Sequence, residues 1–250
     1  MLSINPKEIS TSKLHGYLLG AVAPRPIAFA STIDENGNPN LSPFSFFNVF
    51  GSNPPTMIFS PARRVRGNTT KHTLQNVEKI KEVVINVVNY EIVQQMSLSS
   101  SEYAQGVNEF VKAGFTMLPS DLVKPFRVAE SPVQFECKVK DIIYTGDEGG
   151  AGNLIICEVV KIHIQDEVLD ESGNIDHSIP VEIRNSDVLT GNNLGMLGNV
   201  ESLPNNGDVD NFAKEHPELI GLEMVKKHTF AQQYLDNNDV ESAWKVLLLK

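Results

Sequence analysis

The pattern of apolar and polar positions predicts short strands along most of this chain. Residues 27–33 and 56–60 are brief apolar runs, and residues 83–88 are so rich in β-branched side chains that they indicate a buried strand. Residues 133–144 and 153–165 form two longer apolar runs around a glycine-rich turn. We therefore expect a protein that is mainly β.

An early hairpin is predicted by the dipeptide Asn36-Gly37, which favours a tight turn between two strands. The return strand covers residues 40–50 and contains Pro43. Because proline has no N–H to donate to a neighbouring strand, this segment is an edge strand, a bulge, or a strand that breaks into a loop.

Helices are fewer, and the longer ones are predicted at residues 74–81, 92–101 and 239–249. Strands and helices do not alternate regularly, which disfavours a doubly wound parallel sheet. An antiparallel barrel with appended helices fits better. The composition shifts after Pro180, and residues 185–211 are rich in Asn, Gly and Asp, which is typical of loops. We expect a barrel domain at residues 1–180 and a loop-rich, helical extension at 181–250 that packs on it.

Charge and composition narrow the functional class. The formal net charge of -10 argues against nucleic-acid and anionic-membrane partners, which need clustered basic side chains. The two cysteines, Cys137 and Cys157, lie in apolar alternating runs and are expected to be buried thiols in a reducing compartment. The N-terminus has no signal-peptide pattern, and no apolar run approaches the ~20 residues of a membrane span. We expect a cytoplasmic protein.

Common catalytic motifs are missing from the sequence. It contains no dinucleotide-binding glycine fingerprint, no phosphate-binding P-loop and no serine-hydrolase elbow. The six histidines have no paired spacing typical of metal ligands, so no metal site is expected. We name no side-chain acid or base, and take His72 and His177 as surface or structural. A bound cofactor is therefore expected to carry the chemistry.

Two neighbouring segments stand out as a candidate binding site. Residues 40–48 combine three phenylalanines with small hydroxyls and amides, which suits a planar heteroaromatic ring; the alternative is an edge strand whose phenylalanines pack inward. Residues 60–76 are the densest basic and hydroxyl stretch, and they run into a helix N-terminus, where phosphates bind. The alternative is a solvated surface in which Thr73 is only an N-cap. A ring wall beside a phosphate cradle predicts a flavin mononucleotide.

Several motifs resemble the flavin reductase-like proteins with an FMN-binding split barrel. The resemblance spans residues 14–180 and rests on several motifs in order. They are Pro24-Arg25-Pro26-Ile27-Ala28-Phe29, Ser31-Thr32, Gly37, residues 40–48, Pro54-Pro55, Phe59-Ser60, Lys71-x-Thr73-x-x-Asn76, Asn108-Glu109-Phe110, Ala113-Gly114-Phe115-Thr116, Glu130-Ser131-Pro132 and Phe135-Glu136-Cys137.

The resemblance implies a six-stranded Greek-key barrel that forms a homodimer, with FMN near the dimer interface. It implies that the isoalloxazine ring is lined by Ser42, Pro43, Phe44, Ser45, Phe46, Phe47 and Asn48. It assigns the phosphate end to Ser60, Lys71 and Thr73, with Arg66 as a further candidate, and gives Arg25 and Asn76 supporting roles. The implied activity is hydride transfer from NAD(P)H to flavin, with an unknown final electron acceptor.

Departures from the family pattern leave other functions open. His72 stands where the family usually has an acid, and the usual short ending is replaced by the extension after Pro180. A non-catalytic FMN carrier or electron shuttle is the main alternative, and a barrel that has lost its flavin and serves as an interaction scaffold is another. The sequence does not distinguish NADH from NADPH, or a fixed FMN from a diffusible one.

Overall fold

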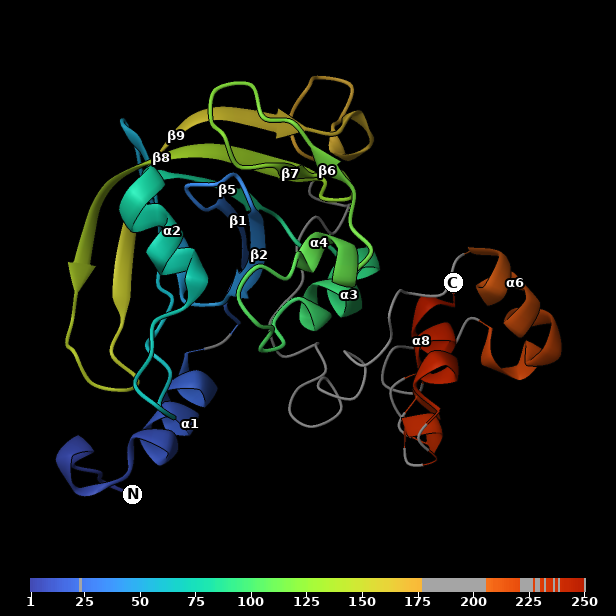
Figure 1. The fold of residues 1–250 in the computed structure, drawn as a ribbon, viewed down its shortest axis with the longest axis horizontal. Coiled ribbons are helices and arrows are strands. Elements are labelled where there is room, and N and C mark those ends of the chain that lie inside the picture. Colours follow the sequence, from blue (N-terminus) through green and yellow to red (C-terminus); the bar gives the residue numbers. More distant parts are fainter. Residues whose placement is uncertain are drawn as a thin grey trace.

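A curved antiparallel sheet forms the body of the protein (Figure 1). The computed structural model describes residues 1–22, 24–176, 206–220, 227, 230–231, 233–235, 237 and 239–249. The strands of the sheet, in its spatial order, are β2 (Pro39–Phe44), β1 (Ala28–Ile33), β5 (Glu82–Asn86), β8 (Val133–Tyr144), β9 (Asn153–Ile164), β4 (Pro55–Phe59) and β3 (Phe47–Ser52). Two short strands, β6 (Met117–Leu118) and β7 (Arg127–Val128), form a separate pair. The prediction of a mainly β protein is confirmed.

The two edge strands of the sheet, β2 and β3, follow each other in the chain and are joined by Ser45 and Phe46. The single return strand predicted for residues 40–50 is therefore two strands, which raises the strand number of this sheet above the expected six. Pro43 lies within β2, opposite Phe29 of β1. It is tolerated there because β2 is an edge strand, which is one of the outcomes expected from the sequence.

The predicted hairpin turn joins β1 to β2. The Asp34 N–H donates to the Asn38 carbonyl at 3.0 Å, and the Asp34 carboxylate accepts hydrogen bonds from the N–H groups of Asn36 and Asn38, both at 2.8 Å. Gly37 has a φ of 83°, a conformation that a residue with a Cβ rarely adopts. The Asn-Gly signal in the sequence thus identified the turn correctly.

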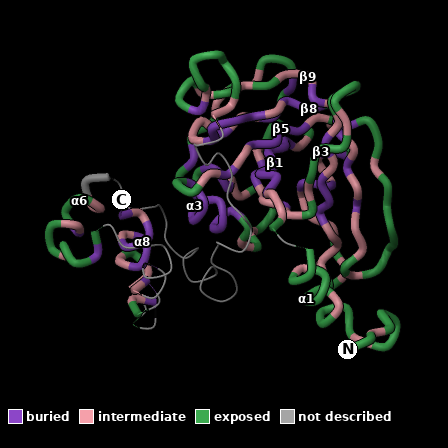
Figure 2. Tube along the Cα trace, turned by 180° about the vertical axis from the view of Figure 1, so that it is seen from behind, coloured by how far each residue is buried: buried purple, intermediate pink, exposed green. Residues whose placement is uncertain are grey.

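β1 is buried along its whole length because both of its faces are covered (Figure 2). Successive side chains of a strand point to opposite faces. Ala28 and Ala30 join the core between the sheet and α2 (His72–Ile80), which also contains Leu74 and Val77 of that helix. Phe29 faces the other way and belongs to a second core with Phe110.

The remaining helices lie outside the sheet. They are α1 (Thr11–Ala21), α3 (Val93–Leu98), α4 (Glu109–Lys112), α6 (Asn206–Glu215) and α8 (Val240–Leu248), with 3-10 turns η1 (Pro6–Glu8), η2 (Tyr90–Ile92), η3 (Asp166–Val168) and η5 (Pro217–Leu219). None of the helices drawn from the described residues is both long and apolar enough to span a bilayer. The predicted helices at 74–81, 92–101 and 239–249 correspond to α2, α3 with η2, and α8.

Two boundaries differ from the sequence predictions. α2 begins at His72, so Thr73 lies inside the helix and Lys71 is the N-cap residue; the interpretation of Thr73 as an N-cap is wrong. The loop expected at residues 185–211 lies partly outside the described residues, and its last positions belong to α6, which begins at Asn206. α6 and α8 contact each other. The boundary at residue 180 lies outside the described residues, so the two-part division stays a prediction.

Candidate functional site

Two adjoining cavities open beside the strand β2 and the segment that precedes α2. One, which we call the polar cavity, has a volume of about 630 Å³; the other, the aromatic cavity, has about 530 Å³. Both volumes are in the range of small-molecule sites. The cavities share Arg64, Val65 and Lys71 in their walls. Together they form one candidate binding site.

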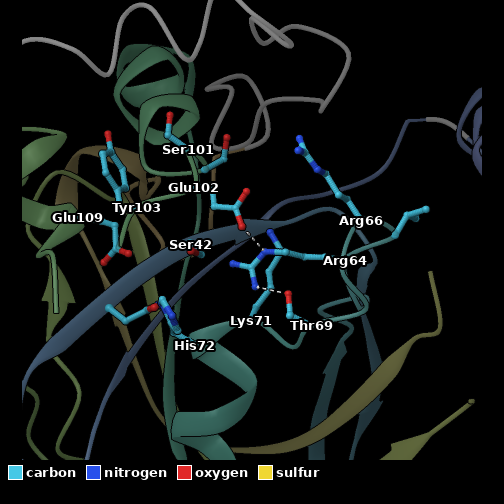
Figure 3. A pocket seen from close by; sticks show the side chains of 13 residues that line it. Ser42, Arg64, Arg66, Thr69, Lys71, His72, Ser101, Glu102, Tyr103 and Glu109 are labelled. Atoms are coloured by element: carbon cyan, nitrogen blue, oxygen red, sulfur yellow. Dashed lines mark hydrogen bonds and ion pairs between the residues drawn. The ribbon is translucent and has the colours of Figure 1, made fainter. Parts of the chain in front are cut away.

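The polar cavity has two chemically different sides (Figure 3). Arg64, Arg66 and Lys71 lie on one side, and Tyr103 and Glu109 lie on the other. Ser42 and Asn40, alternate residues of β2, also line it. The cavity therefore offers cations at one end and protonatable oxygens at the other.

The basic residues are held by the loop at residues 61–70. The Arg63 guanidinium donates to the side-chain oxygen and to the backbone carbonyl of Asn68, each at 2.8 Å. Arg64 donates to the Thr70 carbonyl at 2.7 Å and pairs with Glu102 at 3.0 Å. Arg63 and Arg64 are therefore occupied in shaping the loop, whereas Arg66 is exposed and has no ion pair within the described part of the chain.

Lys71 is a partly buried cation in the wall of both cavities. Its ammonium lies 5.4 Å from the centroid of the Phe44 ring, a cation–π contact. Burial, and then the charge of Arg64, lower the pKa of Lys71. Among the described residues no carboxylate pairs with it, so its positive charge is available to an anionic group of a ligand.

The aromatic cavity provides flat apolar surface. Phe44 and Phe46 line it from the end of β2 and the junction to β3, and Leu14 and Leu18 of α1 line it as well. His15 of α1 lies edge-on to Phe46, with 6.1 Å between the ring centroids. A planar ring system fits such a wall by stacking and edge contacts.

A glycine-rich turn at residues 146–152 packs against the loop at residues 61–70, which we call the basic loop. The Gly150 N–H donates to the Arg63 carbonyl at 3.0 Å, and the Asn68 side chain donates to the Asp147 carbonyl at 2.9 Å. Gly149 lies so close to Val65 that an added Cβ would be 2.8 Å from the Val65 Cα. The tip of the β8–β9 hairpin thus fixes the position of the loop.

Comparison with known proteins identifies the family. The family described as "Flavin reductase like domain" matches residues 20–180. The chain belongs to the flavin reductase-like family. This confirms the resemblance and the split-barrel fold class expected from the sequence, and it makes the cavity pair a candidate flavin site.

Curated proteins and solved structures are similar to this chain over most of their own lengths. An uncharacterized protein of Aquifex aeolicus is 39% identical over 171 residues, which are 68% of this chain and 85% of that protein. The structure of nitrilotriacetate monooxygenase component B from Bacillus cereus has 28% identity and a TM-score of 0.66, covering 70% of this chain and 86% of that one. The 2-nitrobenzoate 2-nitroreductase of Pseudomonas fluorescens has 26% identity and a TM-score of 0.61, covering 70% and 82%.

Eight of the residues that the flavin reductase-like resemblance assigned to the site line these cavities. Lys71 lines both, Ser42 and Arg66 line the polar cavity, and Pro43, Phe44, Ser45, Phe46 and Ser60 line the aromatic cavity. Most of residues 40–48, which we call the ring segment, therefore lie in the cavity walls together with residues of the basic loop.

The other five assigned residues lie outside both linings. Arg25 donates to the carbonyls of Leu19 and Val22 and to the Ser45 hydroxyl, so it joins α1 to the ring segment. The side chains of Thr73 and Asn76 face β2 and β1, where they contact Asn40 at 3.1 Å and Thr32 at 3.1 Å respectively. Phe47 packs against the core between the sheet and α2. Asn48 is exposed, and its side-chain oxygen accepts from the neighbouring Val49 N–H.

Sequence reasoning missed one wall of each cavity. The lining residues of α1 were not predicted, because they belong to an exposed helix without a marked apolar stripe. Ser100, Ser101, Glu102, Tyr103 and Glu109 escaped notice because they lie far along the chain from β2. The Asn108-Glu109-Phe110 motif was the one available signal for this wall.

Glu109 differs from the other acids of the site. It is 5% exposed, and burial raises its pKa to about 7, against the opposing effect of hydrogen bonds from backbone N–H groups, including that of Leu41. By contrast, Asp121, Glu136 and His163 form a cluster elsewhere in which the Glu136 carboxylate accepts three backbone N–H groups and contacts His163 at 2.7 Å. That cluster holds the loop at residues 121–123 to β8, which is a structural task.

Proposed function

We propose that this protein binds FMN in the paired cavities and acts as an oxidoreductase with NAD(P)H as the hydride donor. The observation that carries the proposal is the position of Lys71. Its ammonium lies over the ring of Phe44 and in the walls of both cavities, so one ligand can place a ring on the phenylalanines and an anionic group on the cation. FMN has both parts.

Different residues of this chain would contact the ring and the phosphate of FMN. Phe44 and Phe46 provide the apolar wall for the ring, and Ser42 and Ser45 offer hydroxyls at its edge. Lys71 and Arg66, with Ser60 nearby, hold the phosphate. When bound, FMN supplies the hydride- and electron-transfer chemistry.

Similar proteins support an oxidoreductase over a binding protein without activity. One solved relative is a component of a monooxygenase and another is a nitroreductase. Both descriptions name redox chemistry, a kind of chemistry that a bound flavin can supply. The two free, buried thiols of Cys137 and Cys157 favour a reducing, cytoplasmic setting.

We also propose that the active form is a homodimer. β3 is an edge strand, and two of its apolar residues, Val49 and Phe50, are 57% and 63% exposed. An exposed apolar edge strand is commonly covered by another chain. Light scattering coupled to gel filtration measures the mass directly, and a particle of a single chain's 27.6 kDa would overturn the dimer.

The visible absorption spectrum of the purified protein, recorded with and without added FMN, tests the function. Anaerobic addition of NADH or NADPH should bleach the flavin bands. Bound flavin that stays oxidised with both donors would favour the carrier function instead. A protein that binds no FMN would refute both, and would leave the scaffold function.

A further inference from the structure

The proposed function leaves one buried titratable group of the polar cavity without a task. Glu109 lines this cavity and points into it from the side opposite the cations (Figure 3). Its side chain comes from α4, which packs against β2. Glu109 therefore lies next to β2, the strand that carries Asn40 and Ser42, near the start of the segment assigned to the flavin ring.

Half of the Glu109 carboxyl group has a structural role. Its Oε2 accepts a hydrogen bond of 3.2 Å from the Leu41 N–H. β2 is an edge strand, so a backbone N–H on its outer side has no strand to pair with, and Glu109 supplies the acceptor. The other backbone N–H group that bonds to the carboxyl is that of Glu109 itself, and no side chain within the described ranges donates to it. The Glu109 side chain lines the cavity, where a ligand can reach it.

No cation neutralises Glu109 among the residues that the structure describes. The titratable and charged groups that share its cavity are Arg64, Arg66, Lys71, His72, Glu102 and Tyr103. None of the described basic groups lies within ion-pair distance of it, and β2 and α3, which border α4, carry no charged side chain. A carboxylate that is 5% exposed and unpaired is costly, so the group keeps its proton up to about neutral pH.

A protonated carboxyl group donates a hydrogen bond, which a carboxylate does not. We propose that Glu109 binds ligand as a neutral acid and donates a hydrogen bond from its cavity-facing oxygen to a carbonyl oxygen of the flavin ring. This inference rests on the proposed function and adds a proton requirement to it. Loss of the proton replaces a donor with a negative charge, which repels the carbonyl oxygen and weakens binding.

Riboflavin is the probe for the test, because it lacks the phosphate and has no group that titrates near neutral pH. Its Kd is measured from flavin fluorescence between about pH 5.5 and about pH 8.5. For the wild type, the Kd should rise about tenfold for each pH unit above the pKa of the acid. Glu109→Gln keeps both an acceptor for Leu41 and a donor toward the cavity, so it should bind riboflavin with a pH-independent Kd near the acid-limit value of the wild type.

Two further variants sharpen the test. Glu109→Leu has neither donor nor acceptor and should bind weakly at every pH. Glu91→Gln removes an exposed acid outside both cavities and should keep the wild-type pH profile. A purely structural role for Glu109 predicts no pH dependence that the Gln variant abolishes.

The possible failures are distinguishable. A wild-type Kd that does not change with pH, or a Glu109→Gln variant that keeps the wild-type slope, overturns the Glu109 inference and leaves the flavin site intact. If the Gln variant does not fold, the wild-type pH profile alone still decides the inference. Absence of riboflavin and FMN binding at every pH overturns the proposed function and the inference with it.

Discussion

The side-chain amide of Asn40 donates a hydrogen bond of 3.1 Å to the hydroxyl of Thr73, 33 positions further along the chain. Asn40 belongs to β2 and Thr73 to the first turn of α2, and both are almost fully buried. The bond lies where the ring segment meets the end of the basic loop. It joins the two halves of the proposed flavin site inside the protein.

Thr73→Val removes this hydroxyl with little change of shape and leaves the Asn40 amide without its acceptor. A buried donor left unsatisfied costs about 1–3 kcal/mol, so the free energy of unfolding in urea should fall by that amount. Thr116→Val, at an exposed threonine, is the matched control and should change it by less than about 0.5 kcal/mol. Equal effects of both substitutions would contradict the role of the Asn40–Thr73 bond.

Lys71→Met should weaken FMN binding far more than riboflavin binding. A charge-assisted hydrogen bond contributes about 1.5–3 kcal/mol, which corresponds to roughly a 10- to 100-fold rise of the Kd for FMN. Lys138→Met, at an exposed lysine outside both cavities, should leave both Kd values unchanged. If Lys71→Met weakens the binding of both flavins equally, the lysine does not contact the phosphate.

Glu109 should make the stability of the wild type fall as the pH rises. Its pKa in the folded state, about 7, exceeds the ordinary value of 4.5, so the folded protein binds the proton more tightly than the unfolded chain does. The stabilisation is complete below pH 4.5 and is lost as the pH rises through about 7, a difference of about 3 kcal/mol. Relative to Glu109→Gln, the wild type should therefore lose stability over this range in chemical denaturation, and parallel pH curves would refute the raised pKa.

Gly149→Ala should displace the basic loop. The new Cβ would lie 2.8 Å from the Val65 Cα and 3.0 Å from its carbonyl oxygen, so the backbone has to shift. We expect a loss of about 1–3 kcal/mol in the free energy of unfolding, together with weaker FMN binding. Gly146→Ala, in the same turn, meets only the Ala151 Cβ at 3.4 Å and is the control. FMN affinity that is unchanged in Gly149→Ala would show that the hairpin tip does not position the loop.

Cys137 and Cys157 should resist thiol reagents in the folded protein. Both are buried, and burial raises the pKa of Cys157 to about 12 and that of Cys137 well above its ordinary value. Because the thiolate is the reactive form, a chromogenic disulfide reagent should label neither thiol until denaturant is added, and both afterwards. Rapid labelling of the native protein would contradict this burial.

Local sequence patterns predicted much of the fold. The limits of β8 and the start of β9 follow from alternating apolar residues, and the β1–β2 turn follows from Asn36-Gly37, since both depend on near neighbours in the chain. The break between β2 and β3 was expected near Pro43, yet it falls at Ser45 and Phe46. The position of that break depends on which strands pair across the sheet, and local pattern does not contain this information.

The candidate site was predictable in part for the same reason. The ring segment and the basic loop are close in sequence, so the sequence alone predicts that they form one site. Glu109 meets Leu41 across 68 positions, and the unpaired edge that draws them together exists only after the sheet has formed. No local sequence pattern therefore indicates the raised pKa of Glu109.

The junction between β2 and β3 has a consequence for the rate and the entropy of ligand binding. The Ser45 hydroxyl accepts a hydrogen bond from Arg25, and the carbonyl of Phe46 accepts one from the Ser60 N–H at 2.8 Å, so two other segments of the chain hold the aromatic wall before any ligand arrives. Little conformational freedom remains to be lost when a ring docks there. Association at this wall should therefore resemble lock-and-key recognition, with flavin discrimination set by a rigid template.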